Sequence, residues 1–329
     1  MELAVQVNGS YEHVSEVAAI AEAAGFRAVA LADHYLNGSG PSAYAAPVFD
    51  SLTQAAALAR DTSTIEILTL VSPVTFRHPA VYAKTATTID DLSGGRFALG
   101  LGTGWHQDEH DYFGVPFPDR AERFRRLEDA LGYLHAYREH PARGYDGRFW
   151  RLAPFDVQPR MRPDARLVVG GVGPRRTPEL AGRFAGEFNL AVHEPEVVRE
   201  RIDTMRRAAA AAGRDPDTIS VSTAYRLIGG DTDREVDEFM AEWGAQTGRS
   251  VTEMHGHVGD RIPILTWDQH LGRLDELGRL GFDRAYVKVV TKSPRAFADA
   301  ARRLAPLLRS DNVHDDHTAS HRRDPESES

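Results

Sequence analysis

Residues 65–102 constrain the fold of this chain most, because they hold two apolar segments and a helix between them without interruption. Residues 65–71 form a short apolar run with β-branched members, which is typical of a buried strand. From Pro79 the apolar residues recur at a helical spacing, and proline is favoured at the first helical position. The glycines at 94–95 predict the end of that helix, and residues 96–102 are again apolar. This order predicts two parallel strands joined by a helix.

The alternation of strand and helix continues along the whole chain. Strands are predicted at residues 3–8, 28–32, 65–71, 96–102, 166–171, 188–193, 219–227 and 284–290. Helices are predicted at residues 13–25, 49–60, 80–92, 121–139, 177–185 and 195–213, with at least two more within 231–281. Loops are expected at residues 37–47, 106–120 and 254–264, and a hairpin with an Asp-Gly turn at 145–150. Eight repeats favour an α/β fold, a closed (β/α)8 TIM barrel with loop and helical insertions, over an open doubly wound sheet.

Length and composition are consistent with one domain. An α/β barrel commonly reaches 329 residues, so we expect a single domain over residues 1–309 and a disordered polar tail over 310–329. The absence of cysteine and of a signal-peptide pattern favours the cytoplasm. A net charge of −9 argues against nucleic acid as a partner, and no apolar run would span a membrane. We therefore expect a small-molecule substrate, with a homodimer left open.

Residues 170–177, GGVGPRRT, are the most specific local signal in the sequence. They leave a buried strand and enter a helix, with Thr177 expected as N-cap and Pro178 at the first helical position. Glycines let the main chain approach a phosphate, and free N–H groups at the helix N-terminus attract it. The alternative is a tight turn that needs positive φ. Arg175 and Arg176 would face either the phosphate or the solvent.

Asp33 and His34 follow the second predicted strand and offer acid–base chemistry. Imidazole exchanges a proton near neutral pH, so His34 is the candidate catalytic residue. Neighbouring residues on a strand point to opposite sides, and Asp33 is therefore not expected to pair with His34. The alternative for His34 is a buried, hydrogen-bonded histidine with no role in catalysis.

The glycines at 100, 102 and 104 do not form a dinucleotide fingerprint, because the spacing G-x-G-x-x-G is absent and no helix is predicted directly afterwards. We expect them to make room for a planar ring system. Trp105, His106 and Glu109 would then lie on a loop over the end of the barrel and meet the substrate. The acids and histidines of residues 105–111 do not predict a metal site, since no matching ligand pattern accompanies them.

Three segments resemble the luciferase-like monooxygenase superfamily, in particular its branch that uses the deazaflavin coenzyme F420. They are SPVTFRHPAVYAK, SGGRFALGLGTGW and VVGGVGPRRTPELA, and the resemblance covers residues 3–308. It implies a barrel whose strand-end residues bind the cofactor. The implied cofactor-binding residues are Asp33, Thr69, Leu70, Gly102, Thr103, Gly170, Gly171, Gly173, Arg175 and Thr177.

The resemblance also implies specific roles at two positions. His34 would lie beside the reacting face of the cofactor, and Thr69-Leu70 would form a non-prolyl cis peptide that backs the deazaflavin ring. In sugar-phosphate dehydrogenases of this branch a glutamate follows G-T-G, whereas Trp105 stands there in this chain. This departure argues against glucose 6-phosphate and fits a more apolar substrate. Arg226 and His193, at two further strand ends, are expected to point toward the same rim.

The function implied is an F420-dependent oxidoreductase that transfers a hydride between C5 of the deazaflavin and an organic substrate. The competing interpretation keeps the fold and replaces F420 by reduced FMN, which would make the protein a monooxygenase. A third, non-catalytic interpretation is a barrel that only binds a flavin. F420 is favoured over FMN because Asp33-His34 and the pattern of strand three resemble the F420 branch. Asp33-His34 together with the whole glycine turn makes the non-catalytic interpretation the least favoured.

Overall fold

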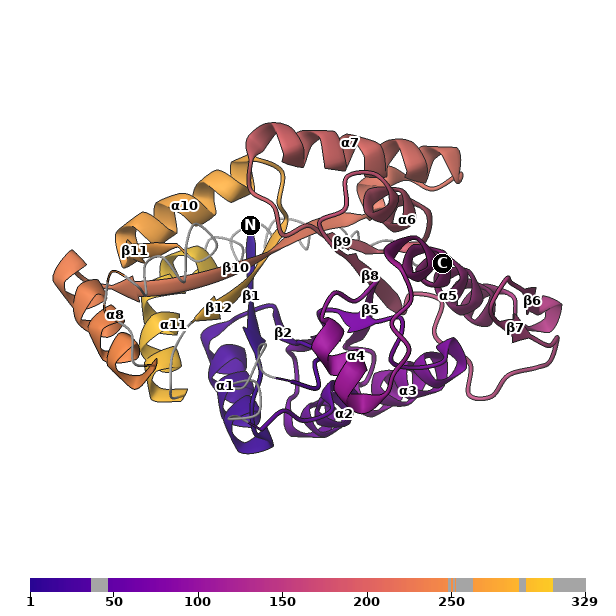
Figure 1. Ribbon diagram of the computed structural model, residues 1–329, viewed down its shortest axis with the longest axis horizontal. Helices are drawn as coiled ribbons and strands as arrows, with labels where there is room; N and C mark the ends of the chain where they lie inside the picture. Colours follow the sequence, from indigo (N-terminus) through magenta and orange to yellow (C-terminus); the bar gives the residue numbers. More distant parts are fainter. Residues whose placement is uncertain (37–46, 248–249, 251, 253–262, 290–293, 310–329) are drawn as a thin grey trace, which may run out of the picture.

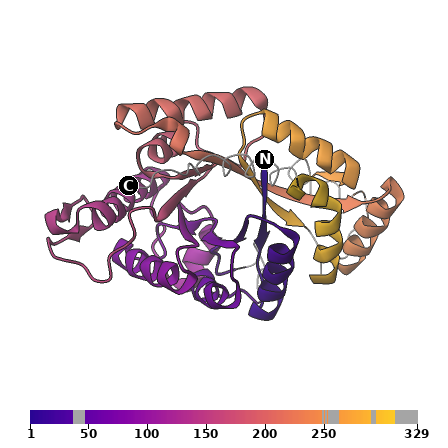
Figure 2. The same ribbon diagram turned by 180° about the vertical axis from the view of Figure 1, so that it is seen from behind.

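A computed structural model describes residues 1–36, 47–247, 250, 252, 263–289 and 294–309 of the chain. Eight parallel strands close into a barrel, with helices around the outside (Figures 1 and 2). In order around the barrel they are β1 (Glu2–Val7), β2 (Ala28–Leu31), β3 (Glu66–Thr69), β5 (Phe97–Gly102), β8 (Arg166–Gly170), β9 (Glu187–Asn189), β10 (Ser220–Gly230) and β12 (Arg284–Val289). Pairing of β12 with β1 closes the ring. The expected (β/α)8 architecture is confirmed.

The helices follow the strands as the apolar spacing predicted. They are α1 (Tyr11–Ala24), α2 (Ser51–Asp61), α3 (Pro79–Ser93), α5 (Arg120–Glu139), α6 (Arg176–Phe184), α7 (Pro195–Ala211), α8 (Asp233–Thr247), α10 (Trp267–Arg279) and α11 (Pro294–Arg309). Left-handed glycines end α1 and α3, at Gly25 and Gly94. No helix within the described residues is long and apolar enough to cross a membrane.

Short elements interrupt the regular alternation. They are β4 (Ser72–Pro73), α4 (Gln107–Phe113), the 3-10 turns Pro141–Arg143 and Pro216–Thr218, β6 (Tyr145–Asp146), β7 (Arg151–Leu152) and β11 (Ile264–Thr266). The loops expected at 37–47 and 254–264 fall almost entirely outside the described residues, and the tail expected at 310–329 does so completely.

Two expectations about local structure were wrong. The predicted loop 106–120 contains α4, which Gly114 ends in the left-handed conformation. The helix has no apolar periodicity because the residues it buries are Glu109 and His110. In the hairpin, Tyr145 pairs with Leu152, so four residues form the turn rather than two. The Asp129 carboxylate of α5 accepts hydrogen bonds from three backbone N–H groups of that turn.

The apolar core has two layers. The larger one lies between the strands and the surrounding helices. The smaller one fills the barrel interior, mostly with small side chains: Ala4, Ala28, Ala30, Leu68, Leu70, Ala98, Val168 and Tyr286. Four of these eight residues are alanines, on β1, β2 and β5.

An ionic cluster fills the opposite, N-terminal end of the barrel. Arg284, 5% exposed, donates to Glu2 at 2.5 Å and to Glu66 at 2.9 Å, and lies 3.5 Å from Glu187. All four are the first residues of their strands, so they meet in one plane at the base. Burial favours the neutral form of Glu66, but Arg284 and then Arg166 reverse this and lower its pKa. The base of the barrel is therefore closed by compensated charges.

Candidate functional site

A backbone irregularity follows β3 at the C-terminal end of the barrel. The peptide bond Leu70-Val71 is cis, whereas the expected cis bond was Thr69-Leu70. Thr69 is instead the last residue of β3, and its hydroxyl donates to the carbonyl of Gly100 and accepts from the N–H of the same residue. The predicted cis peptide is present, one position later.

The glycines of β5 and β8 accommodate the side chain of Val71. A Cβ atom on Gly102 or Gly170 would lie 2.8 Å from a methyl group of Val71. One on Gly100 would lie 2.9 Å from Val71 and 2.0 Å from the carbonyl oxygen of Thr69. Such separations are too short for any side chain. Val71 therefore packs against Gly100, Gly102 and Gly170, and the expectation that the glycines at 100, 102 and 104 make room for a planar ring stays a prediction.

His34 lies just beyond β2 and contacts a buried carboxylate. Its Nδ1 is 2.9 Å from Oε1 of Glu109, which is fully buried. The same oxygen accepts hydrogen bonds from the N–H groups of Tyr35 at 2.7 Å and Leu36 at 3.1 Å. Glu109 thus fixes the chain after β2 and the ring of His34 together. Its other oxygen, Oε2, is buried without a hydrogen-bond partner in the described part of the chain.

The carboxylate sets the proton arrangement of His34. Burial would raise the pKa of Glu109, but hydrogen bonds from His34, Leu36 and Tyr35 outweigh it and lower the pKa. An ionised Glu109 accepts from Nδ1–H of His34, which leaves Nε2 to exchange a proton elsewhere. This is the geometry in which a carboxylate orients a catalytic imidazole.

Trp105 and His106 complete the surroundings of His34. The indole of Trp105, 69% exposed, stacks on His106 with ring centroids 4.9 Å apart and meets His34 edge-on at 5.6 Å. His106 is buried, and its Nδ1 lies 3.5 Å from Glu109. Donor atoms of His34, His106 and Glu109 lie within 4.8 Å of one another, a grouping that the sequence did not predict. We interpret it as a hydrogen-bonded cluster because Oε1 of Glu109 already accepts two backbone N–H groups.

Asp33 has a different partner from His34. It is 1% exposed and accepts from both terminal nitrogens of Arg77, at 2.5 and 3.3 Å. Arg77 also pairs with Asp50, the N-cap of α2. Asp33 therefore connects the end of β2 to the β3–α3 connection, and its expected contact with the cofactor remains a prediction.

The glycine turn after β8 has the expected course into a helix. Gly171 has a φ of 151°, and a Cβ on Gly171 or Gly173 would lie 3.3 or 2.7 Å from the side chain of Thr177. Thr177 is 3% exposed, and its hydroxyl makes no hydrogen bond within the described residues. Helix α6 begins at Arg176, so Thr177 is the second helical residue and not the N-cap.

The two arginines of this turn point away from it. Arg175, with its side chain 83% exposed, forms an ion pair with Glu179 one turn along α6. Arg176 donates to the carbonyl of Ala121 and lies over the ring of Phe124. The anion site expected at this turn, and the expected contact of Arg175 with the cofactor, remain predictions.

His193, at the end of β9, is held by strand β10. Its Nε2 lies 2.8 Å from the hydroxyl of Thr223, and burial lowers its pKa. A second buried histidine, His270 of α10, bonds to the hydroxyl of Tyr225 and the carbonyl of Ile228. Both histidines have structural partners on β10.

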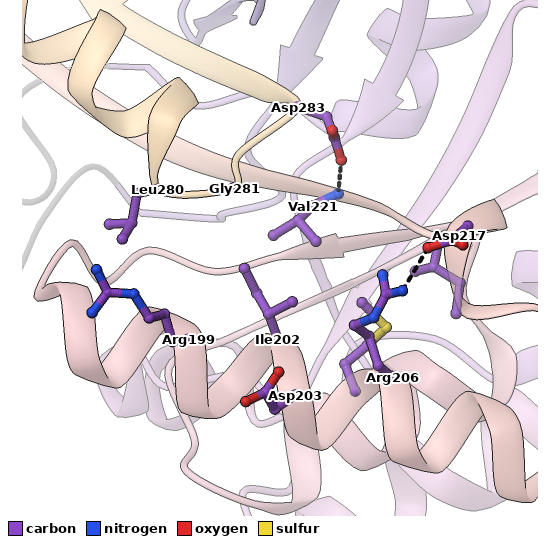
Figure 3. Close-up of a pocket in the computed structure, with 11 residues that line it drawn as sticks. Arg199, Ile202, Asp203, Arg206, Asp217, Val221, Leu280, Gly281 and Asp283 are labelled. Atoms are coloured by element: carbon purple, nitrogen blue, oxygen red, sulfur yellow. Dashed lines mark hydrogen bonds and ion pairs between the residues drawn. The ribbon is translucent and has the colours of Figure 1, made fainter.

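A pocket of about 410 Å³ lies on the outside of the barrel, away from these residues (Figure 3). It is bounded by α7, the start of β10 and the turn before β12. Asp217 accepts a hydrogen bond from Arg206, and Asp283 accepts one from the N–H of Val221. Two of the carboxylates that line the pocket therefore already have partners. Since β10 and β12 begin here, the pocket is at the opposite end from His34.

The sequence of the chain matches a protein family over residues 3–280, described as luciferase-like monooxygenase. The chain belongs to this family. The aligned part spans about three-fifths of the length of the curated relatives it matches.

Relatives within the luciferase-like family differ in cofactor. The FMNH2-dependent dimethylsulfone monooxygenase of Pseudomonas putida is 27% identical over 69% of this chain and 61% of its own length. The F420-dependent glucose-6-phosphate dehydrogenase of Microbacterium testaceum is 30% identical over 61% of this chain and 59% of its own. The F420-dependent tetrahydromethanopterin reductase of Methanopyrus kandleri shares the fold, with a TM-score of 0.72, 18% identity and coverage of 92% and 97%.

Several contacts of this luciferase-like site were missed from the sequence. Glu109 was assigned to the substrate rim, but the structure buries it against His34. Gly114 as a helix end was the available signal, because it would have placed Glu109 in the first turn of a helix. Nothing local to Val71 or Arg77 indicated their contacts, which depend on residues from other strands and helices.

Proposed function

We propose that this luciferase-like protein is an F420-dependent oxidoreductase that transfers a hydride between C5 of the deazaflavin and an organic substrate. The observation that carries the proposal is the His34–Glu109 pair at the end of β2, on the strand next to the Val71 irregularity of β3. The relative from Microbacterium testaceum, which depends on F420, supports the choice of cofactor.

The residues present fit a cofactor that carries a phosphate. Gly171 and Gly173 bring the backbone close to the side chain of Thr177, a residue that is 3% exposed and whose hydroxyl makes no hydrogen bond within the described residues. Helix α6 is nine residues long, and its N-terminus adds free N–H groups. These groups would hold the phosphate, while Val71 and His34 would face the ring.

When bound, reduced F420 supplies a hydride to an electrophilic carbon. His34 would supply the proton from Nε2 to the atom next to that carbon, and Glu109 would stabilise the imidazolium form before the transfer. In the reverse direction the same nitrogen accepts the proton. Trp105, edge-on to His34, would cover this position on the solvent side.

The second candidate function is an FMNH2-dependent monooxygenase on the same fold. The relative from Pseudomonas putida favours it, because that protein depends on FMNH2 and matches a larger share of the chain. A barrel that binds a flavin without catalysis is the third candidate. It assigns no chemical role to the His34–Glu109 pair.

Cofactor titration is the most direct test of the proposal. We expect the purified protein to bind F420 more tightly than FMN, as measured by the change in cofactor fluorescence on addition of protein. Each cofactor is titrated in oxidised and reduced form, without oxygen for the reduced forms. Micromolar binding of FMN with none of F420 would favour the monooxygenase instead.

A glycine substitution tests the phosphate position. We expect Gly171→Leu to weaken F420 binding by about tenfold or more, because the new side chain would occupy the space beside Thr177. Gly213→Leu is the matched control, since Gly213 also has positive φ, a Cβ there would meet nothing within 4 Å, and the neighbouring Arg214 bonds to the other end of α6. Equal affinity in a folded Gly171→Leu protein would contradict the assignment.

A further inference from the structure

Two cations lie side by side at the C-terminal end of the barrel. Arg226 of β10 and Lys288 of β12 are direct partners in the strand pairing. Their side chains face the interior, because Tyr286, two residues before Lys288, belongs to the inner core. Within the described residues, no carboxylate forms an ion pair with either cation.

Other interior cations of the barrel are compensated. At the base, Arg284 and Arg166 both contact Glu66. At the C-terminal end, the described residues supply no carboxylate to Arg226, which is exposed, or to Lys288, which is partly buried. Burial, and then repulsion from Arg226, lowers the pKa of Lys288 to about 8. An anion placed between these two like charges would be attracted by both and would relieve their repulsion.

We propose that Arg226 and Lys288 bind an oxyanion of the substrate, a carboxylate, phosphate or sulfonate group. The inference rests on the proposed function and specifies its substrate class. Arginine offers a planar pair of donors and lysine a mobile one, a combination suited to an oxyanion. The exposed Trp105 fits an apolar part of the same molecule.

The strand order favours the substrate over the cofactor as the source of the anion. The proposed phosphate position follows β8, whereas Arg226 and Lys288 lie two and three strands further around the barrel. β10 and β12 lie across the barrel from β3 and β5, where Val71 and its glycines are. A molecule anchored at the two cations would therefore extend across the barrel end toward the ring.

Sulfate is a suitable probe, because it carries the oxyanion and no other feature of the unknown substrate. The chain has three lysines, Lys84, Lys288 and Lys292, so lysine labelled with ¹³C and ¹⁵N gives three side-chain signals. Lys288→Met assigns the signal of Lys288. With F420 at saturation, we expect sulfate to raise the pKa of Lys288 by about one unit, because the anion stabilises the charged amine.

Variants separate the two sources of the anion. Lys288→Met and Arg226→Met are each expected to weaken sulfate binding about tenfold or more and to leave F420 affinity within about twofold. Lys84→Met, on the outside of α3, is the matched control and should change neither. Unchanged sulfate binding in both variants, or a loss of F420 affinity in its place, would overturn the proposal.

The same titration in the Gly171→Leu protein without cofactor distinguishes this inference from the proposed function. A sulfate-dependent rise in the pKa of Lys288 there supports the anion site, even if the wild-type protein binds no F420. If the pKa of Lys288 does not rise with sulfate in either the wild-type or the Gly171→Leu protein, the anion site is overturned. The cofactor assignment is then decided separately, by the titration with F420 and FMN.

Discussion

We expect His34→Ala to lower turnover about 10²–10⁴-fold while cofactor affinity changes little, because proton transfer contributes to rate far more than one ring contact contributes to binding. The reaction is followed as oxidation of reduced F420 in single-turnover experiments, with substrates found by screening organic acids against the wild-type protein. If His34 only packs against the ring, the variant would instead lose affinity and keep its rate at saturating cofactor.

Conservative variants separate proton transfer from orientation. His34→Gln restores size and a hydrogen-bond donor to Glu109 without a titratable proton, and near-normal rates in it would reduce His34 to an orienting residue. Glu109→Gln keeps the shape but removes the charge. In its ¹⁵N NMR spectra we expect the preference for the Nδ1–H tautomer of His34 to weaken, whatever the substrate is.

We expect Arg284→Met to destabilise the fold by about 3–5 kcal/mol, because it removes the cation that Glu2, Glu66 and Glu187 share at the base of the barrel. Urea unfolding followed by circular dichroism at pH 7 measures the change in unfolding free energy. Arg279→Met, which breaks an exposed ion pair with Asp275, is the control and should cost about 1 kcal/mol or less.

The destabilisation should depend on pH in a defined direction. The pKa of Glu66 is lowered in the folded protein, so its stabilising contribution is present above the pKa of the unfolded chain and is lost as pH falls through the lower folded value. The Arg284→Met protein lacks much of the stabilisation that ionised Glu66 provides. The difference between wild type and variant is therefore largest near neutral pH and narrows in acid; a constant difference would contradict the ionic interpretation.

The sequence predicted the barrel well because periodicity is a local signal. The alternation of apolar strands with amphipathic helices located all eight strands, and proline and glycine located the ends of α3. It failed at α4, because a helix that buries a glutamate and a histidine lacks the apolar spacing by which helices are recognised. The cis bond came from the family resemblance and not from periodicity, and it lies at Leu70-Val71, one residue after the position that the resemblance implied.

The candidate site was predicted in its components and missed in its contacts. His34 was selected from one segment as the catalytic candidate, and Trp105 and Glu109 were selected from another as substrate contacts. Their meeting depends on the first turn of α4 lying against the end of β2, which no short stretch of sequence encodes. The pairing of Arg226 with Lys288 likewise follows from strand register and not from spacing along the chain.

The packing of Val71 among Gly100, Gly102 and Gly170 has a consequence for how such a chain can evolve. A side chain on any of the three glycines would overlap Val71, while a smaller residue at position 71 would leave an unfilled hollow. A single substitution at any of these four positions therefore creates either a steric overlap or a cavity. Tolerated changes need at least two of the positions to vary together. Among descendants of this chain, the valine and the three glycines should be inherited as a unit, although Val71 follows β3 and the glycines lie on β5 and β8, up to about 100 residues away.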